Sequence, residues 1–371
     1  MSTSKGLEGI IVAETDITSI EEGKLSYVGY SIDDLAEHAS FEEVVYLLWH
    51  KHLPDEETLH KFKAQLFDEM SLSSAFIDQL KHMHVDNAHP MDVLRTAVSM
   101  LSLYDAEHDH EDQASNFNRA IRLQAKMAMV ITTFHRLRNK APLIQPKQAF
   151  SYAENFLYML HGKDVDPLET KAFNKALVLH ADHELNASTF TARVCVATLS
   201  DLYSGLTAAI SALKGPLHGG ANEQVIKMLM EIETAENAIP YVKEKIANKE
   251  KIMGMGHRVY KEGDPRAKHL KAMSKEITKQ KGMPQWYEMS EKIESYVKET
   301  KGLPANVDFY SASMYHALGI PHDLFTPIFA MSRTSGWIAH MLEQYANNRL
   351  IRPRAEYVGP TNQTFKPVNE R

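Results

Sequence analysis

The chain has 371 residues, of which 44% are hydrophobic and 24% are charged, and its formal net charge is −7 at pH 7. These values are typical of a globular protein long enough for two domains, and the negative charge argues against a general nucleic-acid binder. A single cysteine, Cys195, excludes an intrachain disulfide, and no uncharged apolar run approaches the about 20 residues of a membrane span, so we expect a soluble cytoplasmic protein.

The N-terminal part of the chain predicts a small β element followed by many helices. Residues 6–30 alternate weakly and contain β-branched residues, which is typical of one or two short strands. Ser40-Phe41-Glu42-Glu43 is a capping box before an apolar helical face. Further helices are predicted after Asp55, from Pro90, and over 117–139, 147–161, 167–183, 187–198 and 201–214. The last three are apolar on nearly all sides, which predicts burial in the interior or at a subunit interface.

The pattern changes at about residue 220. The helices predicted over 221–233, 237–249, 265–280 and 285–300 are rich in lysine and glutamate. Apolar helices return at 309–318 and 324–347, and the tail 352–371 predicts an extended arm. We therefore predict an all-α fold with minor β structure near the N-terminus. Its large helical domain comprises 1–219 and 323–371, and a smaller helical domain is inserted at 220–322.

The stretch KGPLHGGAN places His218 after a glycine-proline turn and just before a predicted helix. The positive end of the helix dipole lowers the pKa of such a histidine and favours the neutral imidazole. A neutral imidazole can donate a hydrogen bond to a carbonyl oxygen on which negative charge develops. The alternative is that this stretch is only a turn between helices.

The segment GDPRAKHL predicts a helix that begins in an unusual way. Asp264 is suited to the N-cap and Pro265 to the first helical position, so Arg266 falls in the first turn. A cation at this end opposes the helix dipole. The placement is favourable if Arg266 and the free backbone amides converge on an anion.

The loop before this helix, MGMGHRVYK, gathers glycines and cations. Gly254 and Gly256 let the backbone approach a ligand closely. His257, Arg258 and Lys261 surround that position. The glycine spacing matches neither a dinucleotide fingerprint nor a P-loop. The alternative is a solvated basic loop.

Two charged residues stand in the C-terminal apolar segments. Asp308 in NVDFYS is either an ordinary N-cap or a general base, and a base would need partial desolvation to raise its pKa. Arg333 in FAMSRTSGWIAH needs an anionic partner if it is buried. No carboxylate lies one helical turn away from it, so this partner is distant in sequence or is a ligand.

These stretches together resemble the citrate synthase family. PLHGGAN, MGMGHRVYKEGDPR, NVDFYSA and SRTSGWIAHMLEQ occur in that order, and the match runs from GLEG to IRPRAEYVGP, essentially the whole chain. The resemblance implies an all-α fold whose two domains close over the substrates, usually as a homodimer. It implies an acyltransferase that condenses acetyl-CoA with oxaloacetate and hydrolyses citryl-CoA to citrate and CoA. A CoA thioester is then a co-substrate, and no tightly bound cofactor or metal is expected.

The resemblance also implies roles for individual residues. Asp308 would take a proton from the acetyl methyl group, His218 would hydrogen-bond the thioester oxygen, and His257 would polarise and protonate the oxaloacetate carbonyl. Oxaloacetate would be bound by His183, Arg266 and Arg333, with Arg352 reaching in from the other subunit. The adenine and phosphates of CoA would lie at Gly254, Gly256, Arg258 and Lys261.

Three other functions are open at this point. A 2-methylcitrate synthase would use propionyl-CoA, and the one additional methylene is worth only about 1–3 kcal/mol of discrimination. A metal-dependent hydrolase could use His180, Asp182 and His183, although no obvious further ligand accompanies them. A helical scaffold without catalytic activity is the third.

Overall fold

The computed structural model describes residues 5–7, 9–83, 86–107, 112–257, 259–260 and 262–371. Arg258 and Lys261, to which the resemblance assigns contacts with CoA, lie outside the described residues. The predicted all-α class is confirmed, because the described chain is built almost entirely of helices and carries one three-stranded sheet. Among these residues, no helix combines the length and apolar character that crossing a bilayer requires.

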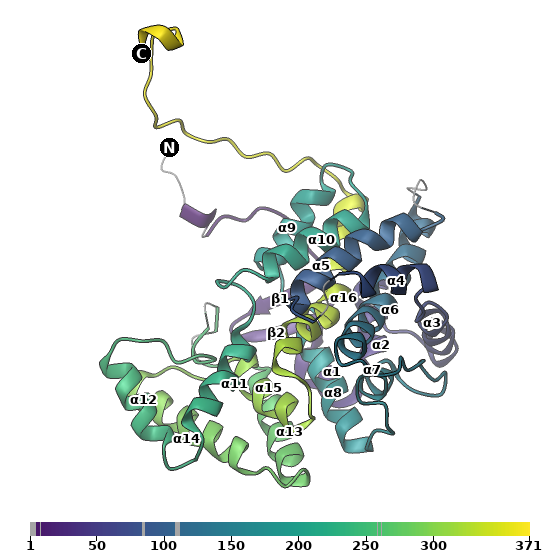
Figure 1. Ribbon diagram of the computed structural model, residues 1–371, viewed down its shortest axis with the longest axis vertical. Helices are drawn as coiled ribbons and strands as arrows, with labels where there is room; N and C mark the ends of the chain where they lie inside the picture. Colours follow the sequence, from purple (N-terminus) through teal and green to yellow (C-terminus); the bar gives the residue numbers. More distant parts are fainter. Residues whose placement is uncertain (1–4, 8, 84–85, 108–111, 258, 261) are drawn as a thin grey trace.

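The helices lie in two groups (Figure 1). The larger group contains α1 (Ile32–His38), α2 (Phe41–His50), α3 (Glu56–Asp68), α4 (Ser74–Lys81), α5 (Pro90–Leu101), α6 (Gln113–Arg138), α7 (Tyr152–His161), α8 (Pro167–His180), α9 (Ala187–Val196), α10 (Leu202–Leu213) and α16 (Phe325–Ala346). The smaller group contains α11 (Ala221–Ile232), α12 (Ala238–Ala247), α13 (Ala267–Gln280), α14 (Gln285–Lys301) and α15 (Val307–Ala317).

Local capping explains where several helices begin. The capping box predicted for α2 is present, since Ser40 Oγ accepts the backbone N–H of Glu43 and the Glu43 carboxylate accepts that of Ser40. Asp55 caps α3 as predicted. The helix predicted from residue 147 begins only at Tyr152, because Ser151 provides the N-cap. The short helices α1 and α4 have no counterpart among the predicted helices.

The helix predicted over 167–183 is too long at its C-terminal end. α8 stops at His180, and residues 181–186 form an irregular segment before α9. Glu184 in this segment has a left-handed backbone, with φ of 50°, which a continued helix would not allow. The difference matters because His183 lies in this irregular segment rather than on a helix.

The predicted N-terminal β element is confirmed as an antiparallel sheet in the order β1 (Thr18–Glu21), β2 (Lys24–Tyr27) and β3 (Tyr30–Ser31). Tyr27 is fully buried, and its hydroxyl donates to the backbone oxygen of Asp182 at 2.9 Å. The sheet thereby anchors the segment that follows α8.

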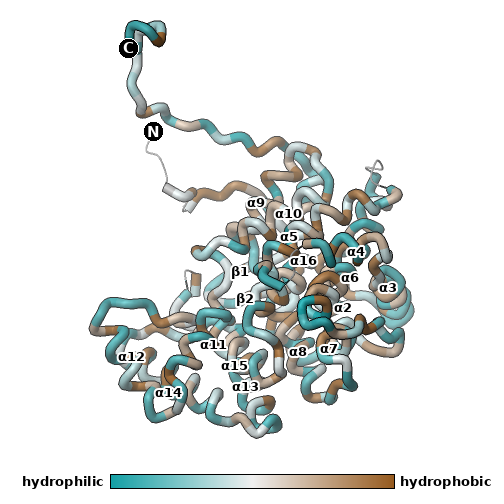
Figure 2. Tube along the Cα trace, viewed as in Figure 1, coloured by the Kyte–Doolittle hydropathy of each residue, from teal (hydrophilic) through white to brown (hydrophobic). Residues whose placement is uncertain are grey.

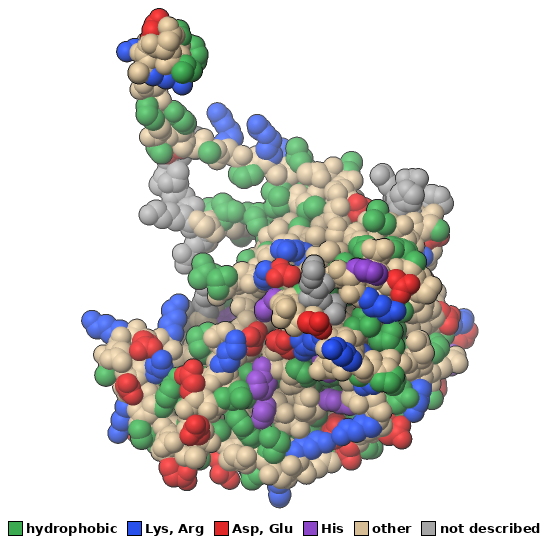
Figure 3. Space-filling view, viewed as in Figure 1, with side chains coloured by type: hydrophobic (Ala, Val, Ile, Leu, Met, Phe, Trp, Pro, Cys, Tyr) green, Lys and Arg blue, Asp and Glu red, His purple; other side chains and the backbone are tan. Residues whose placement is uncertain are grey.

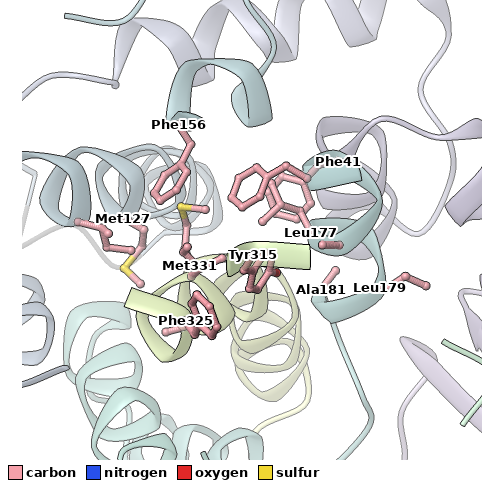
Figure 4. Packing of buried hydrophobic residues seen from close by; sticks show 14 of the residues in the cluster. Phe41, Met127, Phe156, Leu177, Leu179, Ala181, Tyr315, Phe325 and Met331 are labelled. Atoms are coloured by element: carbon pink, nitrogen blue, oxygen red, sulfur yellow. The ribbon is translucent and has the colours of Figure 1, made fainter. Parts of the chain in front are cut away.

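The hydrophobic core surrounds α16, whose residues from Phe325 to Met341 are almost all buried. Figure 4 shows Met331 and Phe325 of this helix among Tyr315 of α15 and Phe156 of α7. Burying one such large apolar side chain contributes about 1.5–3 kcal/mol to stability. Hydrophilic residues dominate outer helices such as α3 (Figure 2).

The chain after α16 forms the extended arm that the sequence predicts. From residue 348 onward it contains only one short 3₁₀ turn, Val368–Glu370, and it stands away from the helical body (Figures 1 and 3). Its apolar side chains are exposed: Leu350, Tyr357, Val358, Phe365 and Val368.

Candidate active site

A cavity of about 1000 Å³ lies between the two groups of helices and brings together seven of the predicted site residues. Four of them lie in the loops before α11 and α13 or at the cap of α13. The other three lie on α15, on α16 and in the segment after α8. The seven residues are His183, His218, Gly256, His257, Arg266, Asp308 and Arg333.

Asp308 lies in the first turn of α15 and is not its N-cap. Asn306 holds the cap position, and its side-chain oxygen accepts the backbone N–H of Asp308 at 3.0 Å. The alternative interpretation of Asp308 as an ordinary cap is therefore wrong. Burial raises the pKa of Asp308 to about 6, although Arg266 acts in the opposite direction. A carboxylate with this pKa is a stronger base than an exposed aspartate and is still ionised at neutral pH.

His218 lies in the turn before α11 and hydrogen-bonds Ser188. Its Nε2 lies 2.7 Å from Ser188 Oγ and accepts the backbone N–H of Ser188 at 3.3 Å. A backbone N–H can only donate, so the proton of the neutral ring is on Nδ1. The pKa of His218 falls to about 4, and the causes are burial and the positive charge of Arg333. The predicted lowering of this pKa is confirmed. Its causes are burial and Arg333, and not the helix dipole that the sequence suggested.

His257 has the opposite tautomer. Its Nδ1 accepts the backbone N–H groups of Val259 at 3.0 Å and Tyr260 at 3.3 Å, which leaves the proton of the neutral ring on Nε2. The ring centroid lies 4.7 Å from that of Tyr260 and 5.3 Å from that of His183. His183 Nε2 lies 3.0 Å from the Tyr260 hydroxyl. The pKa of His183 is well below its ordinary value because of burial and the nearby arginines.

Arg266 is buried and already paired with a carboxylate. Its Nε and Nη2 donate to Asp264 at 2.9 and 2.8 Å. α13 begins at Ala267 with Arg266 at its cap, so the prediction of Asp264 as N-cap is wrong. Asp264 instead accepts the backbone N–H groups of Arg266 and Val307, and so connects α13 to α15. Its carboxylate compensates the buried guanidinium.

Arg333 is 2% exposed, and no described carboxylate lies within ion-pair distance of it. Its Nε donates to the backbone oxygen of His180 at 2.7 Å, and its guanidinium lies over the ring of Phe329. A buried guanidinium with only a carbonyl and a ring beside it is costly unless an anion binds it. The expectation that its partner is a ligand therefore fits the described residues.

Gly254 and Gly256 both adopt left-handed backbone conformations, with φ of 76° and 80°. Gly254 accepts the N–H of Asn306, and Gly256 donates to Pro304, so this loop pairs with the segment before α15. A Cβ on Gly254 would collide with Phe309. Gly256 lines the cavity, whereas Gly254 does not. Among the described residues, the lack of a side chain at Gly254 therefore lets the backbone pack against Phe309, rather than against the cavity.

Arg352 is the one predicted site residue, among those described, that lies on the exposed arm. It lines a second cavity of about 790 Å³ together with Arg193, Arg349 and Glu343, and it does not line the cavity that holds His218 and Asp308.

Sequence reasoning assigned no role to two residues that hold imidazoles of this cavity, Ser188 and Tyr260. Tyr260 occurs inside the glycine loop MGMGHRVYK, and Ser188 follows shortly after the histidines His180 and His183 that were considered for a metal site. Their position there was the only available signal, since serine and tyrosine are common in loops.

The three residues of the alternative metal site point to different partners. His180 donates from Nδ1 to the backbone oxygen of Ala176, Asp182 accepts from Thr18, and His183 contacts Tyr260. In the part of the chain that the structure describes, no cluster of histidine, cysteine and acidic side chains is arranged to hold a metal ion. The described residues therefore give the hydrolase hypothesis no support.

The chain is similar to known proteins over its whole length. The family model for the citrate synthase C-terminal domain matches residues 6–354. Citrate synthase 2 of Bacillus subtilis (strain 168) is 59% identical over 371 residues, which is 100% of both chains. The citrate/2-methylcitrate synthase of the same strain is 43% identical, covering 97% of this chain and 98% of its own. The ternary complex of carboxymethyl coenzyme A and oxaloacetate with citrate synthase from the archaeon Thermoplasma acidophilum superimposes with a TM-score of 0.93 at 36% identity, covering 100% of both chains.

Proposed function

The chain belongs to the citrate synthase family and catalyses the condensation of acetyl-CoA with oxaloacetate, and on this basis we propose that Asp308, His218 and His257 carry out the chemical steps. Arg333 supports this assignment most directly. Its buried charge faces a cavity that also contains a raised-pKa carboxylate and two oppositely protonated imidazoles.

The first step is removal of a proton from the acetyl methyl group by the Asp308 carboxylate. Even with a pKa of about 6, this base is too weak to form a free enolate from a thioester. The Nδ1–H of neutral His218 therefore donates to the thioester oxygen as negative charge develops there. Ser188 fixes the ring for this purpose, because it occupies Nε2.

The second step is formation of the carbon–carbon bond. The enol carbon attacks the carbonyl carbon of oxaloacetate, and the carbonyl oxygen takes up a proton from the Nε2–H of His257. Two backbone N–H groups hold Nδ1 of that ring and direct Nε2–H away from them. Water then hydrolyses the thioester of citryl-CoA to release citrate and CoA.

Oxaloacetate is bound by Arg333, Arg266 and His183. A guanidinium can contact a carboxylate through two parallel hydrogen bonds, which fits a dicarboxylate substrate. Arg333 has no described carboxylate partner and is therefore the principal anchor. The glycine loop with Gly256, Arg258 and Lys261 binds CoA, which acts as a co-substrate and not as a tightly bound cofactor.

The molecule works as a cytoplasmic homodimer of two-domain subunits. The large domain comprises residues 1–219 and 323–371, and the small domain comprises 220–322 and closes over the substrates. Exposed apolar side chains along the arm support docking onto a second copy of the chain. Docking of this kind would carry Arg352 to the partner's oxaloacetate site.

A thiol-release assay tests the proposed function. Purified protein should release CoA from acetyl-CoA in proportion to added oxaloacetate and should release almost none without it. Release that is independent of oxaloacetate would contradict the proposed condensation. Comparing kcat/KM for acetyl-CoA and propionyl-CoA then decides between citrate and 2-methylcitrate synthesis, and we expect acetyl-CoA to be preferred.

A further inference from the structure

Asp182, the residue before His183, carries a fully buried carboxylate, and no described lysine or arginine lies within ion-pair distance of it. One of its oxygens, Oδ2, lies within hydrogen-bond distance of Thr18 Oγ1 at 2.6 Å, of the backbone N–H of Glu184 at 3.1 Å and of His340 Nε2 at 3.2 Å. Burying a carboxylate without a cationic partner costs free energy, and an apolar side chain could fill the same space without that cost. Its hydrogen bonds therefore indicate a specific role.

The bond from Glu184 to Asp182 closes a turn around His183. Glu184 has a left-handed backbone, which costs about 1 kcal/mol for a residue with a side chain. The turn therefore needs a tether. Tyr27 adds a second one by donating to the backbone oxygen of Asp182. These contacts set the direction in which the His183 side chain leaves the backbone and enters the cavity.

His340 holds the Asp182 carboxylate from α16. It is fully buried and lies seven residues after Arg333, on the same face of the helix. Arg193 Nη1 donates to His340 Nδ1 at 3.2 Å. A guanidinium can only donate, so Nδ1 is the acceptor, and the ring proton on Nε2 is directed at Asp182.

Two further residues hold the Arg193 guanidinium in place. Its Nη1 donates to Glu343 and its Nε to Gln344. Glu343 in turn accepts the backbone N–H of Asp16. A continuous chain of hydrogen bonds thus runs from the partly exposed Glu343 through the buried Arg193 and His340 to Asp182, and it ends at the turn that carries His183.

We propose that Asp182 and His340 are positioning residues that hold His183 in the orientation in which it binds oxaloacetate. This inference rests on the proposed role of His183 in oxaloacetate binding. Asp182 and His340 do not touch the substrate. They act by fixing the backbone turn, with His340 as a neutral imidazole that donates to Asp182 and accepts from Arg193.

Two substitutions at His340 separate positioning from packing. His340→Phe removes both hydrogen bonds and should raise the Kd for oxaloacetate about tenfold or more, since small misplacements at a binding site are costly. His340→Gln can still donate to Asp182 and accept from Arg193, so its Kd should stay within about threefold of the parent value. The KM for acetyl-CoA should change less than about twofold in both variants, because the hydrogen bonds of His340 go to Asp182 and Arg193 and not to the described residues of the CoA loop.

Gln124→Leu is the matched control. Gln124 is equally buried and donates to the backbone of Met331 on α16, but it belongs to another set of contacts. Its loss should lower the melting temperature without a selective effect on oxaloacetate. Asp182→Ala, which removes the oxygen that accepts from Thr18, Glu184 and His340, should resemble His340→Phe and replaces it if that variant does not fold.

Each result decides the proposal. The proposal is wrong if His340→Phe and Asp182→Ala weaken the binding of both substrates equally, in step with the melting temperature, or weaken the binding of neither. It is also wrong if His340→Gln binds oxaloacetate as poorly as His340→Phe, because a neutral hydrogen-bonding relay would then be insufficient. His183→Ala tests the premise separately: unchanged oxaloacetate binding in that variant would contradict the assigned site itself.

Discussion

At the scale of single residues, burial determines which protonation states the cavity offers. It raises the pKa of Asp308 and lowers that of His218, each toward the uncharged form. The carboxylate remains ionised above pH 6, whereas the imidazole is neutral throughout the physiological range. The cavity thus provides a base and a neutral hydrogen-bond donor at the same pH. The two buried arginines of the cavity differ in their partners: Arg266 is paired with a described carboxylate, and Arg333 is not.

Asp308→Ala should abolish proton abstraction while leaving the oxaloacetate site intact. A positioned general base contributes about 10²–10⁴-fold to a rate, so kcat should fall by about three orders of magnitude or more. The Kd for oxaloacetate, measured by calorimetry, should change little. Loss of oxaloacetate binding with kcat largely retained would contradict the role assigned to Asp308.

The pH dependence of the reaction should report the raised pKa of Asp308. The base must be deprotonated to act, and its pKa is about 6. kcat/KM for acetyl-CoA at saturating oxaloacetate should therefore be constant above about pH 7 and fall about tenfold per pH unit below pH 6. His218, with a pKa of about 4, adds no further loss until the pH is much lower. A rate that stays constant down to pH 5 would disagree with the raised pKa.

At the scale of elements, the site is assembled where helices end. His183 lies in the irregular segment after α8, His218 in the turn before α11, and His257 in the loop that pairs with residues 304–306. Each of these turns contains a positive backbone φ angle: at Glu184, at Gly220, and at Gly254 and Gly256. Rigid helices then fix the ends of each loop, so a loop can hold an imidazole in one orientation.

Gly254→Ala should disrupt the loop that carries His257. The new Cβ would meet Val225 and Phe309 in a left-handed conformation, and we expect a loss of about 1–3 kcal/mol in the free energy of unfolding. Activity should fall with it.

Gly282→Ala is the matched comparison for that substitution. Gly282 also has a positive φ, of 68°, but a Cβ there meets nothing within 4 Å. Gly282→Ala should therefore lose only the cost of a left-handed backbone for alanine, about 1 kcal/mol in the free energy of unfolding. Urea unfolding of both variants measures the difference, and equal losses would show that the contacts with Val225 and Phe309 do not matter.

At the scale of the whole molecule, the proposed dimer would complete the site of each chain with a residue from the other. The arm after α16 is exposed and bears apolar side chains, and Arg352 lies outside the cavity that contains His218. In the proposed dimer, a second copy of the chain would bury these side chains, which do not stabilise an extended segment while they face water.

Mixing two inactive variants tests whether Arg352 acts in the partner subunit. Asp308→Ala and Arg352→Ala each lack one component of the site. If Arg352 crosses the interface, a mixed dimer contains one site with both components, and a refolded equimolar mixture should recover about one quarter of the parent activity. Absence of any recovery in mixtures that do form mixed dimers would mean that Arg352 acts within its own chain.

The sequence by itself determined the all-α class, most helix positions and several of the residues that line the cavity. Helical periodicity and caps such as Ser40 and Asp55 are local, so they can be recognised without coordinates. The ordered motifs identified His218, His257 and Asp308 by resemblance. The N-cap of α15 and the end of α8 were missed, because Asn306 and Glu184 give weak local signals.

Only the tertiary structure decided how those residues are protonated and held. Ser188 sets the tautomer of His218, backbone amides set that of His257, and Asp264 compensates Arg266 while Arg333 remains without a described carboxylate. These facts depend on burial and on contacts between segments that are far apart in the chain. Free energies of desolvation and hydrogen bonding arise only when such segments meet, so no local pattern of residues can specify them.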